Sequence, residues 1–66
     1  MTKIRALRIE NDMTAKAVAE QLRLDKSVLS FVERRKAKAS DRVRLKLSSF
    51  FGVAETELFN NERFAV

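Results

Sequence analysis

Residues 13–36 read MTAKAVAEQLRLDKSVLSFVERRK, and their pattern sets the architecture of the whole chain. Apolar side chains recur here at the spacing of two short amphipathic helices. Thr14 and Asp25 stand where each helix would begin, and both residue types are suited to capping a helix N-terminus. The inward-facing residues are Val18, Ala19 and Leu22 in the first helix and Leu29 and Val32 in the second. The stretch therefore predicts two helices joined by a short turn.

The flanking sequence predicts three more helices. Ile4, Leu7 and Arg8 share one face of a helix over 3–11, and Asn11-Asp12 signals the first turn. The next cap is Ser40, before a helix whose apolar residues are Val43, Leu47, Phe50 and Phe51. The only glycine, Gly52, follows that helix, and a last helix over 54–59 would turn Leu58 and Phe59 to the core. We thus expect one all-α domain over residues 1–66, a compact bundle of about five short helices with a tail over 60–66.

The composition excludes several classes of function. With 66 residues the chain holds one small domain, and 45% hydrophobic residues supply its core. It has no His and no Cys, so zinc sites of the usual kind, imidazole or thiol catalysis and disulfides are excluded. No glycine-rich phosphate loop is present, and no apolar run approaches the roughly 20 residues that span a bilayer. We expect a cytoplasmic protein that is not an enzyme and needs no metal, cofactor or small-molecule ligand.

Positive charge is concentrated in one part of the chain. The 14 Lys and Arg residues outnumber the 9 Asp and Glu residues and give a net charge of +5. Between Arg34 and Lys46 there are seven basic residues against a single acid, Asp41. Such a run taken alone is usually a solvated helix face, but this one directly follows the predicted helix pair. Its position favours a polyanionic partner such as a phosphate backbone.

Residues 13–36 resemble the helix-turn-helix of the Cro/repressor family, also called the XRE family. The residues that match that motif without a gap are Met13, Thr14, Val18, Ala19, Leu22, Leu24, Leu29, Ser30, Val32, Glu33 and Lys36. Further matches lie upstream, through Ile4, Leu7 and Arg8, and downstream as far as Phe59. The resemblance covers nearly the whole chain and implies a lambda-repressor-like fold. In that fold the helix that begins after Asp25 enters the DNA major groove while the preceding helix lies across the backbone.

The resemblance also implies roles for individual residues. The resemblance places the helix-turn-helix motif over about residues 14–34. It also implies a partly buried ion pair between Arg8 and Glu33 that has a structural role. Base-reading side chains are implied at Lys26, Ser27 and Phe31, with Ser30 nearby, and the remaining contacts would be to phosphates. The implied DNA-binding residues are Thr14, Lys16, Lys26, Ser27, Ser30, Phe31, Arg34, Lys36 and Lys38. The implied partner is double-stranded DNA, bound by a homodimer whose contact we expect in the tail, at Phe64 and Val66.

Several residues depart from the family pattern. Ala15 replaces the usual glutamine of the first motif helix, and Arg23 replaces the glycine of the turn. If that turn keeps its left-handed residue, Arg23 costs roughly 1 kcal/mol relative to glycine. Arg35 replaces the glycine after the second motif helix, which leaves no strong stop signal there. We therefore expect this helix to continue toward Lys38.

Two apolar residues leave the function open between two classes. Val28 and Phe31 stand on the outer side of the second motif helix, where polar side chains are common. Phe31 has three interpretations: it contacts a thymine methyl group, it contacts a protein partner, or it is buried in the core. The first favours a small Cro-like repressor of a phage or mobile element, associated with the bacterial nucleoid. The second favours a protein-interaction module, an antirepressor or modulator that binds another repressor protein.

Overall fold

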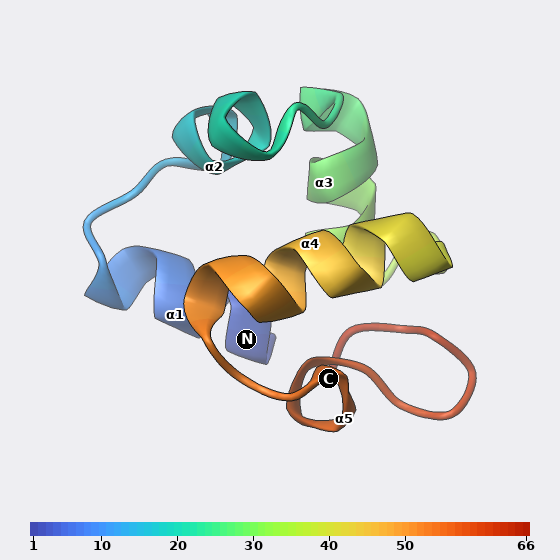
Figure 1. Cartoon of the computed structure of the whole chain (residues 1–66). Helices are drawn as coiled ribbons and strands as arrows, with labels where there is room; N and C mark the ends of the chain where they lie inside the picture. The colour runs from blue at the N-terminus through green and yellow to red at the C-terminus, as the bar shows by residue number, and fades with distance from the viewer.

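A computed structural model describes all residues from 1 to 66 and contains five helices (Figure 1). The helices are α1 (Lys3–Glu10), α2 (Ala15–Leu22), α3 (Lys26–Glu33), α4 (Asp41–Phe51) and α5 (Glu55–Leu58). In Figure 1, α4 crosses the molecule between the α2–α3 pair on one side and α1 with α5 on the other. The predicted all-α class is confirmed, and no helix combines the length and apolar character that a bilayer crossing requires.

Three of the helices begin at side chains that cap their first turn. The Thr14 hydroxyl accepts a hydrogen bond from the Ala17 amide at 3.1 Å, and the Asp25 carboxylate accepts one from the Ser27 amide at 2.9 Å. Ser40 does the same for α4, accepting from the amide of Val43. Each cap satisfies an amide that has no partner within its helix, which explains why the helices begin where the sequence predicts.

Each of the first four helices is followed, within two residues of its last residue, by a residue with left-handed backbone geometry. These residues are Asp12 (φ 54°), Arg23 (φ 56°), Arg35 (φ 62°) and Gly52 (φ 68°). After α3, the Lys36 amide donates to the Phe31 carbonyl at 2.8 Å, which closes the last turn. The predicted continuation of this helix toward Lys38 is therefore wrong. Arg35 adopts the conformation that glycine would adopt more easily, and α3 stops at Glu33.

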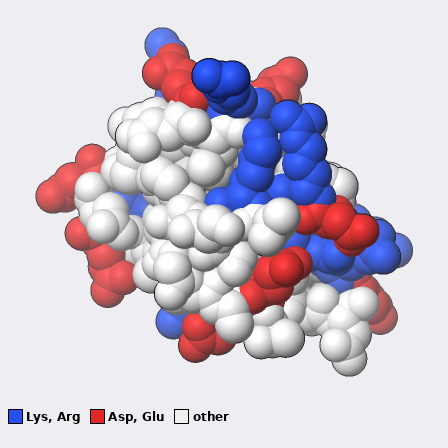
Figure 2. Space-filling view, viewed as in Figure 1, with Lys and Arg blue, Asp and Glu red and all other residues white.

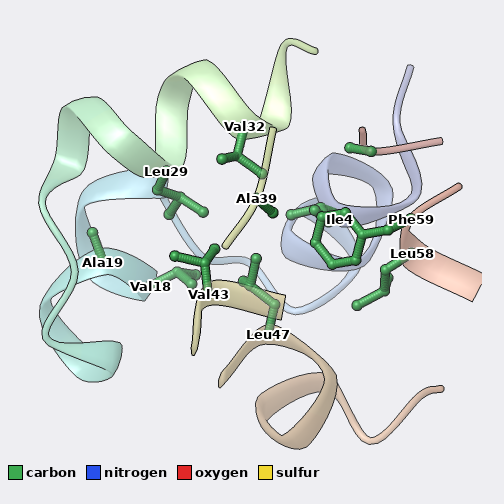
Figure 3. Packing of buried hydrophobic residues seen from close by; sticks show 11 residues of the cluster. Ile4, Val18, Ala19, Leu29, Val32, Ala39, Val43, Leu47, Leu58 and Phe59 are labelled. Atoms are coloured by element: carbon green, nitrogen blue, oxygen red, sulfur yellow. The ribbon is translucent and has the colours of Figure 1, made fainter. Parts of the chain in front are cut away.

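The core lies where α4 meets the other helices. Figure 3 shows Leu29 and Val32 of α3 pointing toward Val43 and Leu47 of α4. Ala19 is 2% exposed, so the α2–α3 pair can approach closely only because this side chain is small. The complete buried cluster is Ile4, Val18, Ala19, Leu29, Val32, Ala39, Val43, Leu47, Leu58, Phe59 and Ala65.

The tail folds back onto its own chain. Ala65 is fully buried and forms an antiparallel bridge with Phe59. The Val66 amide donates to the Leu58 carbonyl at 3.0 Å, and the Val66 carbonyl accepts from the Lys3 amide at 2.7 Å. Backbone groups of the tail are thus used within the chain, and they hold its two ends side by side.

Candidate nucleic-acid interface

Helix α3 divides into a buried and an exposed face. Leu29 is 0% exposed and Val32 is 1% exposed, and both pack into the core. On the opposite side Val28 is 43% exposed and Phe31 is 47% exposed. The interpretation of Phe31 as a core residue is therefore wrong. An eight-residue helix with one anchored face presents its other face in a fixed orientation.

The exposed face of α3 is hollowed by a shallow pocket of about 260 Å³, which we call the reading pocket. Its lining residues are Lys26, Ser27, Ser30, Phe31 and Arg34. These are five of the nine side chains for which the resemblance implies DNA contact, and they come together on one surface. They combine a cation, two hydroxyls, an aromatic ring and a guanidinium, which suits an edge of a base pair next to a phosphate.

Phe31 is held in place from one side by Arg34. The guanidinium carbon of Arg34 lies 5.6 Å from the centre of the Phe31 ring, a cation–π distance. The Arg34 Nε donates to the Ser30 carbonyl at 3.4 Å, so the guanidinium is tied to the end of its own helix. The ring is therefore both exposed and restrained, which limits the conformational entropy it loses on binding.

The other four predicted contact residues lie outside α3. Thr14 and Lys16 are exposed at the N-terminal turn of α2, where free amides favour an anion. Lys36 is exposed in the connection to α4. Lys38 lies farther along this connection, and its Nζ is 5.9 Å from the centre of the half-buried Phe64 ring. Lys38 is thus oriented toward the tail, and it does not line the reading pocket.

An ion pair fixes the C-terminal end of α3 against α1. The Arg8 Nη2 donates to Glu33 Oε1 at 2.7 Å, and its Nε donates to Oε2 at 3.1 Å. The hydrogen bonds to Glu33 raise the pKa of Arg8, against the opposing effect of burial. The Thr2 hydroxyl adds a bond to the Glu33 carbonyl at 3.0 Å. This pair is the one that the resemblance implied, and its position makes it a brace for α3.

A second group of cations lies between the α2–α3 connection and α4, where Figure 2 shows basic side chains gathered. The Lys46 Nζ donates to the Leu22 carbonyl at 2.6 Å at the end of α2. Desolvation, followed by the charges of Arg42 and Arg23, lowers the pKa of Lys46. The sequence analysis did not place Arg23 or Arg42 among the site residues. The signal for Arg23 was an arginine in a turn where the resemblance expects glycine.

The fold and this surface define a helix-turn-helix protein. The family model described as "Helix-turn-helix" matches residues 4–58, and the chain belongs to this family, of the Cro/XRE type. No significant match was found among curated proteins or among solved structures. The match covers α1 from its second residue and the whole of α2 to α5, so the family assignment includes the helices that brace the motif as well as the motif itself. The protein is a DNA-binding regulator of the helix-turn-helix class.

Proposed function

We propose that this protein is a sequence-specific transcriptional regulator, a small Cro-like repressor of a phage or mobile element. It acts by occupying its operator with α3 in the major groove of each half-site. The observation that carries the proposal is the reading pocket, because it puts Lys26, Ser27 and Phe31 on the exposed face of a helix whose other face is locked into the core.

Each side chain of the reading pocket suits a different feature of the groove. The Lys26 ammonium is a donor for the O6 and N7 of guanine, and the Ser27 hydroxyl is both donor and acceptor. The restrained ring of Phe31 is apolar and suits the methyl group of thymine. Thr14, Lys16 and Lys36 contribute phosphate contacts at the edges of the groove, which fix the register without reading bases.

The active unit in this proposal is a homodimer. A single domain of this size buries too little surface for high specificity, and paired half-sites about one helical turn apart solve this problem. Phe64 is half-buried and Val66 is 45% exposed, and both side chains lie on the tail. Since the Val66 amide and carbonyl are bonded within the chain, the contact is expected through side chains. Because Ala65 is fully buried, the test changes an exposed side chain alone: Val66→Asp would leave mass and DNA affinity unchanged if the contact lies elsewhere.

Selection from a randomised duplex pool at about 150 mM salt tests the proposal, with the affinity of the winning duplexes followed against salt. We expect an enriched inverted repeat and a steep fall of affinity with salt. A steep salt dependence without enrichment would show backbone binding only, and no retention of any duplex would contradict the proposal.

The contact assigned to Phe31 has its own test. Replacing one thymine of the selected duplex by uracil removes a single methyl group and leaves the hydrogen-bonding edge unchanged. At the position that faces Phe31, we expect the wild type to bind the uracil duplex several-fold more weakly than the thymine duplex. When cytosine replaces that thymine instead, 5-methylcytosine should weaken binding less than unmethylated cytosine. Phe31→Ala should bind the thymine and uracil duplexes equally. If the wild type and Phe31→Ala lost affinity equally on the change to uracil, Phe31 would not be the contact of the methyl group.

A second function, a module that binds another repressor protein, is favoured by one observation. Val28 and Phe31 place two exposed apolar side chains on the same helix face. Lys26→Ala and Phe31→Ala separate the two functions. In a DNA reader the lysine change relaxes base preference. In a protein-binding module Phe31→Ala abolishes binding of the partner protein, and added DNA does not change that binding.

A further inference from the structure

The largest pocket of the molecule lies next to the reading pocket, on the side of α3 that faces α1 and the chain ends. It has a volume of about 340 Å³, and three arginines line it: Arg5 from α1, with Arg34 and Arg35 from the end of α3. We call it the arginine pocket. Arg34 lines both pockets, so the two are adjacent on one side of α3.

The arginine pocket carries uncompensated positive charge. The ion pairs of the chain are Arg8 with Glu33 and Arg44 with Asp41 and Glu55, and none involves an arginine of this pocket. The only acidic side chain in the lining is Glu33, whose two carboxylate oxygens are taken by Arg8. Three arginines that form no ion pair line one pocket, and guanidiniums suit an oxyanion because each offers several donors in a planar fork.

Arg35 lines the pocket from a turn that does not need an arginine. Its φ of 62° is left-handed, a conformation that glycine adopts at no cost and that arginine adopts under strain. The closing hydrogen bonds of the turn are made by the Arg35 and Lys36 amides, so they do not require an arginine side chain. Asp12, Arg23 and Arg63 share this geometry, so the assignment of Arg35 rests on its place in the pocket lining.

We infer that the arginine pocket binds a phosphate group of the DNA backbone, at the edge of the groove that α3 enters. The inference rests on the proposed DNA-binding function and extends it to α1, a helix outside the α2–α3 pair. The position of Arg34 supports this location. It contacts the ring of Phe31 on the side of the reading pocket and reaches the arginine pocket on the other side.

The test compares Arg5→Gln with Lys3→Gln. Both residues are exposed on α1 and both changes remove one positive charge, but Lys3 does not line the pocket. For Arg5→Gln we expect the slope of log affinity against log salt to fall by about 0.9, with about fivefold weaker binding at 150 mM salt and unchanged base preference. Lys3→Gln should leave the slope unchanged. Equal slopes for the two variants would overturn the inference.

A second variant separates binding from folding. Arg35→Gly relieves the left-handed strain, so it should raise the melting temperature. It should also weaken DNA binding about fivefold, as Arg5→Gln does. Opposite signs in the two measurements are what a phosphate contact requires. A higher melting temperature with undiminished DNA affinity would show that Arg35 is only a helix end, and it would overturn its assignment.

A free oxyanion is the other source of the same chemistry, and titration of the wild type with inorganic phosphate, followed by NMR, distinguishes the two. Shifts at Arg5 and Arg35, together with the reduced salt slope of Arg5→Gln, support the backbone phosphate. The same shifts with an unchanged slope would assign the pocket to a free anion and overturn the inference. If the wild type binds no duplex, the proposed function fails, and the titration alone then decides whether the pocket takes phosphate.

Discussion

The two faces of α3 have opposite environments although they share the same eight residues. The inner face carries Leu29 and Val32, fully buried against α4, and ends at Glu33, which is braced by Arg8. The outer face carries Phe31 and Val28, both more than two-fifths exposed. Stability is therefore concentrated on one side of the helix, and the recognition that we propose lies on the other. Substitutions on the two faces should affect different measurements.

The largest effect is expected on the inner face. Leu29→Ala removes a fully buried side chain and leaves a cavity, so it should lower the free energy of unfolding by about 4 kcal/mol. Phe31→Ala should change it by less than about 0.5 kcal/mol, because the ring is half-exposed. Urea unfolding of both variants measures the contrast. Similar losses in the two would end the division between faces.

The ion pair below α3 should show the next largest effect. Glu33→Gln leaves the guanidinium of Arg8, only 15% exposed, without its charge partner, and should cost about 3 kcal/mol. The double replacement Arg8→Met with Glu33→Leu should cost less than the sum of the two single changes. Thermal unfolding of Arg8→Met, Glu33→Leu and the double variant tests the coupling. Additive losses would mean that Arg8 and Glu33 contribute independently.

The ends of the helices should respond in opposite directions. Arg23→Gly removes left-handed strain at the end of α2 and should raise stability by about 1 kcal/mol, whereas Gly52→Ala introduces the same strain after α4 and should lower it by about 1 kcal/mol. An added Cβ at Gly52 meets no atom within 4 Å, so the loss would come from the backbone alone. Melting temperatures give both signs. A destabilised Arg23→Gly would show that the arginine side chain stabilises the turn.

The smallest effect concerns the titration of Lys46. Desolvation and the charges of Arg42 and Arg23 lower its pKa, so the charged form is disfavoured in the folded state. This unfavourable contribution is fully present below the folded pKa and disappears as pH rises from there to the ordinary pKa of lysine. In an NMR titration Lys46 should lose its proton below the ordinary pKa of lysine, and Arg23→Gln should move its pKa back toward that value. Titration of Lys46 at the ordinary pKa would contradict this assignment.

Much of the fold followed from periodicity and caps. Thr14, Asp25 and Ser40 marked three helix starts, and the inward residues of α2 and α3 are in the core. The end of α3 was mistaken because Arg35 is not a residue whose type signals a left-handed turn. Its conformation is imposed by the hydrogen bonds of Lys36 and by the packing of Ala39, which the local sequence does not show.

The residues of the candidate site on α3 could be named from the sequence, whereas the proposed contact on α1 could not. The resemblance implied Lys26, Ser27 and Phe31 as base-reading residues, and the structure places all three in the lining of one pocket on the exposed side of α3. Arg5, which we propose as a phosphate contact, was missed because it lies on α1, outside the motif, and only the tertiary packing brings it beside Arg34 and Arg35. The exposure of Phe31 was undecided for a related reason, since it depends on how α3 is rotated against α4.

The most direct test of the central claim is to repeat the duplex selection with Lys26→Ala and to measure its unfolding in parallel. If the outer face of α3 recognises DNA and the inner face supports the fold, the variant should unfold with the wild type, within about 0.5 kcal/mol. It should also lose its preference at one base pair per half-site and keep the rest of the operator. An unchanged winning sequence would contradict the claim that α3 reads the bases through this face.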